Sequence, residues 1–306
     1  MKSTYSKNDI ADFLSKKYSE RINLIPIVEG MESQAFSFTR NNQEYVLRIN
    51  PIIEGFLKDD YAYRHFLSSK IPIPKIIECE YFNEKHAFCI SEKVQGITFE
   101  DADEVTVNAL LPSITELWIS IGETDISHTA GYGIFSSKDG NAPFDSWEGH
   151  LLSLLDRQKY DWEKIQRMEN VDTKLINDLK AAIIELLPFC PDERRLCHGD
   201  FGANNLLIDP TLPKITAVID WDRANYGDPL YDIAGAYFWQ TWLMCMEKTS
   251  SYWEKVFGSI PNYHKRLVCY QLHNGLEEIY ENVLDEDTET LNWVQKRCRL
   301  ILEENR

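Results

Sequence analysis

The sequence predicts an α+β protein of two lobes, a small N-terminal lobe built on an antiparallel sheet and a larger, mainly helical C-terminal lobe. Within the first 94 residues, short apolar or alternating runs separated by turn residues are typical of strands. Beyond residue 105, apolar residues recur at helical spacing. The segment 92–96 separates the two patterns, so we expect residues 1–94 to form the first lobe and residues 95–306 the second.

Composition limits the kinds of partner this chain can have. It has 306 residues, 43% of them hydrophobic, which is enough for two packed lobes and excludes disorder as the main state. Acidic side chains outnumber basic ones by 49 to 32, for a net charge of −17. This charge disfavours nucleic acid and anionic membranes and favours a cationic partner, although it also serves solubility.

Localisation and assembly are weakly constrained. The seven cysteines form no C-x-x-C pair and have mostly apolar neighbours, which is typical of reduced thiols in the cytoplasm. Met1–Asn8 is polar and lacks the apolar core of a secretory signal. We therefore expect a cytoplasmic protein with no membrane partner, and a monomer.

The N-terminal lobe opens with a helix, because Ser6 can cap a segment whose apolar residues Ile10, Leu14 and Tyr18 have helical spacing. One further helix is expected at 54–67. Strands are expected at 24–28, 35–39, 44–49, 76–81 and 86–91. One helix can cover a sheet of this size, which gives the small lobe its architecture.

Two features of this lobe are suited to phosphate binding. The turn 29–33, with Gly30 and Ser33, could lay backbone N–H groups over phosphates, with an ordinary hairpin turn as the alternative. Arg48 lies among Tyr45, Val46, Leu47 and Ile49 of a predicted strand, at the place where kinases carry a phosphate-binding lysine. Its partner is expected to be Asp59, with Asp60 as the alternative; a solvated surface arginine is the plainer interpretation of Arg48.

Polar chemistry is concentrated between two apolar runs in the second half of the chain. Asp200 is followed five residues later by Asn205, which leads into the strand-like run 206–208. After a turn, the run 215–219 ends on Asp220. Such a hairpin brings together one base-like carboxylate and two oxygen ligands for Mg²⁺, as in protein kinases. Turn formation alone is the alternative for any one of these residues.

The C-terminal lobe is expected to be built mainly from helices, at 107–121, 146–157, 173–187, 231–246, 263–283 and 288–303. Asp228 and Asp232 are interpreted as caps of the helix that begins near Tyr231. Asp222, two residues beyond the proposed metal ligand, and Trp239 and Trp242 would lie near the mouth of the site.

Three motifs carry a resemblance to a known family. HGDFGANN (198–205), ITAVIDW (215–221) and YGDPLYDIA (226–234) resemble the catalytic loop, metal-ligand segment and following helix of aminoglycoside phosphotransferases, which have a protein-kinase-like fold. With YVLRIN (45–50) and the run 238–247, the likeness is greatest to members acting on hygromycin B. It implies transfer of the ATP γ-phosphate to a hydroxyl of a cationic antibiotic, with Mg²⁺ as cofactor and GTP not excluded.

The resemblance also implies roles for individual residues. Asp200 would be the catalytic base, Asn205 and Asp220 the Mg²⁺ ligands, and Arg48 with Asp59 the phosphate-holding pair. His198 would orient the catalytic loop through backbone hydrogen bonds. Adenine would meet Glu92, Lys93 and Val94, and the acceptor would meet Asp222, Trp239, Trp242 and Glu247. Two alternatives remain: a kinase for a choline-like, sugar or macrolide acceptor, and a nucleotide-binding pseudokinase.

Overall fold

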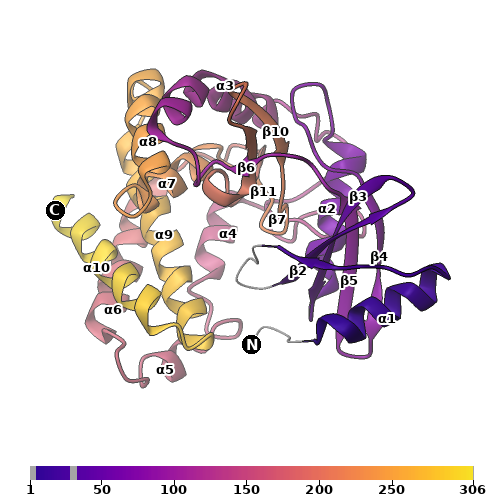
Figure 1. Ribbon diagram of the computed structural model, residues 1–306. Coiled ribbons are helices and arrows are strands. Elements are labelled where there is room, and N and C mark those ends of the chain that lie inside the picture. The colour runs from indigo at the N-terminus through magenta and orange to yellow at the C-terminus, as the bar shows by residue number, and fades with distance from the viewer. Residues whose placement is uncertain (1–4, 28–32, 306) are drawn as a thin grey trace.

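The computed structural model describes residues 5–27 and 33–305. Its N-terminal part is a five-stranded antiparallel sheet in the order β1-β2-β3-β5-β4 (Figure 1). The strands are β1 (Ile25–Pro26), β2 (Gln34–Arg40), β3 (Gln43–Asn50), β4 (Ile76–Asn83) and β5 (His86–Glu92). The α+β fold class is confirmed. Each of the five predicted strands is present, although β1 is shorter than expected.

Two helices belong to this part of the sequence. α1 (Lys7–Tyr18) begins after Ser6, whose Oγ accepts a hydrogen bond from the Asp9 N–H, as the cap pattern predicts. Its buried Ile10 and Leu14 pack with sheet residues in a small separate core. α2 (Ile53–His65) packs on β4 and β5, but its C-terminal half contributes to the core of the other lobe. The boundary at residues 94 and 95 stays a prediction.

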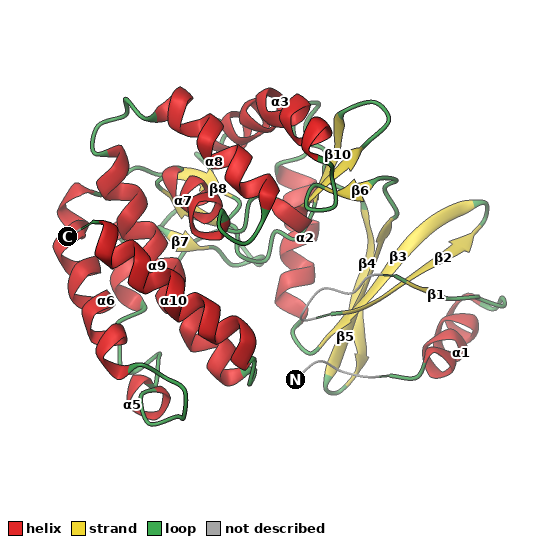
Figure 2. Cartoon of the chain, turned by 60° about the vertical axis from the view of Figure 1, so that its left-hand side comes forward, coloured by secondary structure: helices red, strands yellow, loops and turns green. Residues whose placement is uncertain are grey.

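The C-terminal part is mainly helical, and Figure 2 shows its helices gathered on the side away from the five-stranded sheet. The helices are α3 (Glu104–Gly122), α4 (Trp147–Ser153), α5 (Trp162–Ile165), α6 (Thr173–Leu186), α7 (Leu230–Trp239), α8 (Met244–Phe257), α9 (Tyr263–Leu284) and α10 (Thr288–Glu304). α9 packs against α6, α7 and α10, and α8 packs against α3.

Two small sheets hold the polar loops against these helices. One has the order β10-β9-β6 and the other β7-β11-β8. Their strands are β6 (Ile97–Thr98), β7 (Gly133–Ile134), β8 (Arg195–Cys197), β9 (Leu206–Asp209), β10 (Lys214–Val218) and β11 (Asn225–Gly227). Only β9 and β10 were expected, because strands of two or three residues are too short to show a periodic pattern.

The expected single helix at 231–246 is wrong. α7 ends at Trp239, whose carbonyl accepts hydrogen bonds from the N–H groups of both Trp242 and Leu243. Leu243 has extended backbone, and α8 begins after it in a new direction. The break lets α7 pack on α9 while α8 packs on α3, so tertiary packing overrides an apolar pattern that runs through the turn. The helix expected at 146–157 likewise ends early, at Ser153.

The segment 92–96, which we call the hinge, leads directly into the larger lobe. β6 follows it and pairs with β9, which brings Gly96 against the neighbouring strand. Gly96 has φ +145°, and a Cβ there would lie 2.5 Å from the Ile208 carbonyl oxygen.

Within the described residues, α3 is the one helix long and apolar enough to cross a membrane. Half of its apolar stretch is buried, with Val107, Leu110 and Ile114 in the core.

Candidate active site

The loop that carries Asp200 is held from its N-terminal side. One carboxylate oxygen of Asp232 accepts from the His198 N–H at 3.0 Å, and the other from the Gly199 N–H at 2.8 Å. Gly199 has φ +84°, and a Cβ there would clash with the Arg223 carbonyl oxygen. Asp200 itself is exposed. The interpretation of Asp232 as a helix cap is therefore wrong: it organises the catalytic loop.

Asp228, interpreted in the same way, does cap α7. Its Oδ1 accepts from the Leu230 N–H at 3.0 Å, which satisfies a backbone donor at the start of the helix. The same buried carboxylate accepts from Arg266 Nε at 2.8 Å and from the Tyr270 hydroxyl at 2.5 Å. Asp228 therefore ties α7 to α9 and lies in the core.

Asn205 links the two halves of the predicted constellation. Its Nδ2 donates to the Asp200 backbone oxygen at 2.9 Å and to Asp200 Oδ2 at 2.7 Å. The backbone carbonyl oxygen of Asn205 accepts a hydrogen bond from the Ile219 N–H at 3.0 Å. The Ile219 carbonyl oxygen in turn lies 3.0 Å from His198 Nε2, so His198 contacts the backbone as expected. Because Nδ2 is engaged, Oδ1 of Asn205 is oriented as an available acceptor.

Asp220 lies at the end of this hairpin in a left-handed backbone conformation, with φ +63°. Its side chain is exposed to solvent, yet the surrounding protein displaces much of its water. That desolvation, with the nearby charge of Asp59, raises the pKa of Asp220 well above its ordinary value, although Arg48 opposes the shift.

These residues fit a hard cation. An Asn oxygen and a carboxylate are oxygen donors of the kind Mg²⁺ takes, and Mg²⁺ sites in kinases complete their shell with phosphate oxygens and water. No cluster of three or more His, Cys, Asp or Glu side chains suited to a metal occurs among the described residues.

Arg48 and Asp59 form the predicted ion pair between β3 and α2. The second carboxylate oxygen of Asp59 accepts from the Trp221 N–H at 2.8 Å, directly after Asp220. Asp60, the alternative partner, instead pairs with Arg64 one turn further along α2, at 2.8 Å. Arg48 is thereby held close to the metal-ligand segment from the other lobe.

The hinge continues the edge of the sheet. The Glu92 N–H donates to the Lys75 carbonyl oxygen at 2.9 Å, and the Lys93 N–H to the Glu44 carbonyl oxygen at 3.1 Å. In the described part of the chain, no backbone hydrogen bond uses Val94. Among the predicted adenine contacts, Val94 is therefore a residue whose N–H and carbonyl groups are both available to a ligand.

The predicted phosphate loop is only partly visible. Gly30 lies outside the described residues, so its role stays a prediction. Ser33 directly precedes β2, and its Oγ accepts from Asn50 Nδ2 at 3.3 Å. This contact positions the start of β2 and says nothing about phosphate.

The predicted acceptor residues do not form one cluster. Asp222 packs against α2, where a Cβ added to Gly55 would lie 3.0 Å from its Cγ. Trp239 stacks on Trp293 of α10 with ring centroids 5.0 Å apart, and Trp242 meets Trp293 edge-on at 4.7 Å. Trp242 is 45% exposed. The two predicted tryptophans therefore belong to a three-ring group.

Glu247 lies elsewhere. It is exposed in a groove between α3 and α8, together with Asn108, Leu111, Pro112 and Tyr252. Its surroundings are thus those of α3, and the structure does not bring it together with the tryptophans. That Glu247 faces the acceptor stays a prediction.

An acidic group on α9 escaped the sequence interpretation. Arg223 pairs with Glu277 at 2.5 Å and with Glu281 at 3.1 Å. Burial raises the pKa of the neighbouring Glu278 to about 7, Arg223 opposes the shift, and the charge of Asp200 is among those that add to it. The acids of α9 therefore lie on the same side as the catalytic loop. Their spacing, GLEEIYEN in 275–282, was the available signal.

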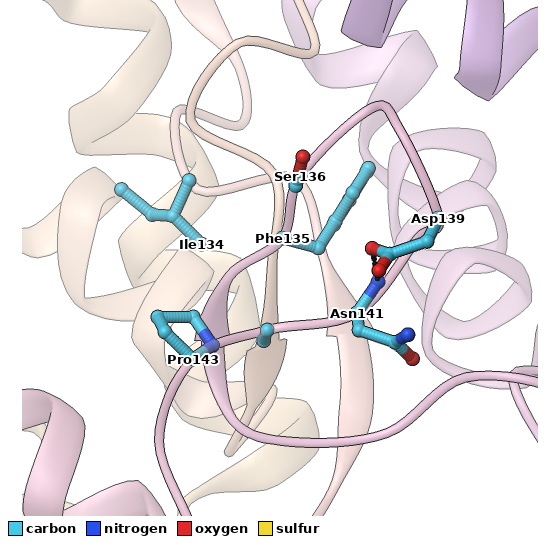
Figure 3. A pocket seen from close by; sticks show the side chains of 7 residues that line it. Ile134, Phe135, Ser136, Asp139, Asn141 and Pro143 are labelled. Carbon is cyan, nitrogen blue, oxygen red and sulfur yellow. Dashed lines mark hydrogen bonds between the residues drawn. The ribbon is translucent and has the colours of Figure 1, made fainter.

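A separate hollow is formed by the loop 134–143. Figure 3 shows Asp139 and Asn141 together on this loop, where the Asn141 N–H donates to Asp139 Oδ1 at 3.0 Å. Its lining consists of residues of that loop alone. None of Asp200, Asn205 and Asp220 lines it, so it is distinct from the group that these residues form.

Three features together are typical of a kinase-like phosphotransferase. They are the Asp200 carboxylate bonded to the Asn205 amide, the Asp220 carboxylate after a strand, and the Arg48–Asp59 pair from the other lobe. Residues 23–252 match the model of the phosphotransferase enzyme family, APH. The chain belongs to this family, and the predicted family membership is confirmed.

Named relatives agree with this assignment. The chain is 36% identical to the hygromycin-B 4-O-kinase of Escherichia coli over 296 residues, which cover 96% of this chain and 84% of that protein. The crystal structure of aminoglycoside phosphotransferase APH(4)-Ia is 34% identical, covers 98% of this chain and all of its own, and superposes with a TM-score of 0.91. A thermostable mutant of that protein, in ternary complex with AMP-PNP and hygromycin B, gives a TM-score of 0.90, covering 97% and 99% of the two chains, also at 34% identity.

Proposed function

We propose that this protein transfers the γ-phosphate of ATP to a hydroxyl of an aminoglycoside or aminocyclitol antibiotic, with hygromycin B as the acceptor. One observation carries the phosphoryl-transfer part: Asn205 binds Asp200 through Nδ2 while its backbone oxygen holds Ile219, the residue before Asp220. Base and metal ligands are thus fixed in one rigid unit. The acceptor part is supported by the relatives that act on or bind hygromycin B.

The residues divide the chemistry as follows. Asp200, exposed and oriented by Asn205, accepts the proton of the acceptor hydroxyl and aims its oxygen at the γ-phosphate. Asn205 Oδ1 and Asp220 hold Mg²⁺, which when bound offsets the negative charge on the phosphates. Arg48, fixed by Asp59, holds the phosphates, and the free backbone groups of Val94 meet adenine. GTP is also compatible with these contacts.

Two groups of side chains, which we call the acceptor wall, support binding of the acceptor. The acids of α9 lie on the same side as Asp200, where carboxylates would attract the amino groups of a cationic substrate. The partly exposed Trp242, with Trp239 and Trp293 behind it, offers an apolar surface for sugar rings. The protein acts in the cytoplasm as a monomer, where an antibiotic that reaches the ribosome would be intercepted.

A coupled assay tests this proposal. The purified chain is given ATP or GTP with hygromycin B, other aminoglycosides, a choline-like amine, a sugar and a macrolide, and the phosphorylated product is located by NMR. We expect turnover with hygromycin B that chelation of Mg²⁺ abolishes. Turnover with a non-aminoglycoside alone would show that the proposed acceptor is wrong, while the proposed mechanism of phosphoryl transfer would stand. Nucleotide binding without turnover on any acceptor would indicate a pseudokinase.

A further inference from the structure

Helix α2 is bound to the C-terminal lobe at successive points along one face. Near its start, Glu54 accepts hydrogen bonds from the Ser137 N–H at 2.8 Å and from the Ser137 hydroxyl at 2.9 Å. One turn later come Lys58 and Asp59. Further on, Tyr61 and Phe66 pack against Phe135, and Phe66 also packs against Trp221. The helix therefore bridges the sheet and the catalytic lobe.

Lys58 is buried in this contact, with 1% of its surface exposed. Its Nζ donates to the Ala224 carbonyl oxygen at 3.1 Å and also to the Asp222 carbonyl oxygen. The ammonium lies 4.7 Å from the centroid of the Phe135 ring, which adds a cation–π contact. A buried ammonium is costly unless such partners satisfy it, so its position indicates a specific requirement.

Lys58 and Asp59 bind the same backbone segment, one as a hydrogen-bond donor and the other as an acceptor. Asp59 accepts from the N–H of Trp221, and Lys58 donates to the carbonyls of Asp222 and Ala224. These three residues lie within the four positions after Asp220, whose φ of +63° is an uncommon conformation for a residue with a side chain. Such a conformation persists when the surrounding structure fixes the backbone.

We propose that Lys58 is a positioning residue for phosphoryl transfer: by holding the backbone of residues 222–224, it fixes the direction in which Asp220 presents its carboxylate to Mg²⁺. Ile219, directly before Asp220, is held by Asn205 and His198, and Asp59 holds Trp221, directly after it. Lys58 adds two contacts further along the same segment, to the carbonyls of Asp222 and Ala224. The inference rests on the proposed function in taking Asp220 as a metal ligand, but it does not depend on the identity of the acceptor.

The test measures nucleotide binding in the full-length protein. Lys58→Met keeps the length of the side chain and removes the ammonium. The dissociation constant of AMP-PNP is measured by calorimetry with Mg²⁺ and with EDTA. The constant with EDTA divided by the constant with Mg²⁺ reports the contribution of the metal. We expect Lys58→Met to reduce this ratio by about tenfold, as loss of a residue that orients a metal ligand does, with the EDTA affinity unchanged.

Lys180→Met is the matched control. Lys180 also has a partly buried side chain over an aromatic ring, 4.2 Å from the Trp162 centroid, but it lies on α6 and touches no part of the site. Its ratio should equal that of the wild type. Lys58→Gln, which retains a donor for one carbonyl, should give an intermediate ratio.

Several outcomes would overturn the inference. A folded Lys58→Met protein with the wild-type ratio would show that the lysine does not position Asp220. Equal loss of affinity with Mg²⁺ and with EDTA would show a general effect on the lobe. If neither Lys58 variant folds while Lys180→Met does, Lys58 serves folding and not positioning. Failure of the proposed acceptor, by contrast, would appear as absent turnover in the wild type and would leave the ratio unaffected.

Discussion

Asp59 of α2 accepts a hydrogen bond from the backbone N–H of Trp221 at 2.8 Å while its other oxygen binds Arg48. One carboxylate therefore connects Arg48 on β3 of the small lobe to the segment that directly follows Asp220 in the large lobe. Because the two oxygens have different partners, substitutions can separate the two connections.

The Asp59 variants should differ in a defined way. Asp59→Asn retains an oxygen for Trp221 and loses the charge for Arg48, so we expect the nucleotide KM to rise by about tenfold, the loss of a charged hydrogen bond. Asp59→Ala loses both partners, and kcat should fall as well. Asp60→Asn, which touches only the Arg64 pair, should behave as wild type. Steady-state kinetics decide, and a greater effect at Asp60 would reverse the assignment.

Asp200→Ala should leave the protein folded and lower kcat by about 10²- to 10⁴-fold, the range for loss of a general base. Its side chain is exposed and supports only Asn205, so little stability is at stake. Thermal unfolding and kinetics are measured together. Asp285→Ala, an exposed aspartate at the end of α9, serves as control. Near-normal turnover of Asp200→Ala would remove Asp200 from the mechanism.

Asn205→Ala and Asp220→Ala should both raise the Mg²⁺ concentration needed for half-maximal activity, by about 10- to 100-fold. The two differ in a second respect. Asn205→Ala also frees the Asp200 side chain, so its kcat should stay low even at saturating Mg²⁺, whereas excess Mg²⁺ should restore more of the Asp220→Ala activity. Unchanged Mg²⁺ dependence in both variants would contradict the metal assignment.

The acceptor side gives a comparison within one short stretch of chain. Trp242→Ala should raise the acceptor KM by about tenfold while the nucleotide KM is unchanged, because it removes an exposed ring from the three-tryptophan group. Glu247→Gln, in the groove against α3, should leave both constants unchanged. The opposite pattern would support the prediction that Glu247 faces the acceptor and would exclude Trp242 from the acceptor-binding residues.

Stability should fall as the pH is lowered, partly through His273. Burial lowers the pKa of His273 from 6.5 to about 3, so the unfolded chain binds a proton that the folded chain does not. The stability due to neutral His273 is complete above pH 6.5 and is lost as the pH falls toward 3. The loss is about 1.4 kcal/mol per pH unit in this window.

Urea unfolding between about pH 7.5 and about pH 5.5 measures this effect. His273→Gln, which can still bond the Tyr231 hydroxyl, should show a smaller decline in the free energy of unfolding than the wild type. His264→Gln alters a mostly exposed ring and should decline as the wild type does. Equal slopes in all three proteins would show that His273 does not control the acid response.

The sequence by itself determined the α+β class, the order of the main elements and the phosphoryl-transfer chemistry. These follow from local rules: periodicity specifies helices and strands, and the spacing of Asp200, Asn205 and Asp220 lies within one hairpin. The pairing of Arg48 with Asp59 was also within reach, because only two acidic residues lay at a suitable distance along α2.

Only the tertiary structure decided how distant segments share the site. The break between α7 and α8, the place of Glu247, and the roles of Asp232, Lys58 and the acids of α9 all depend on contacts between residues far apart in the chain. A buried lysine and a surface lysine look alike in a sequence. Burial and hydrogen-bond partners are properties of packing, and packing is what assigns Lys58 to the backbone beside Asp220.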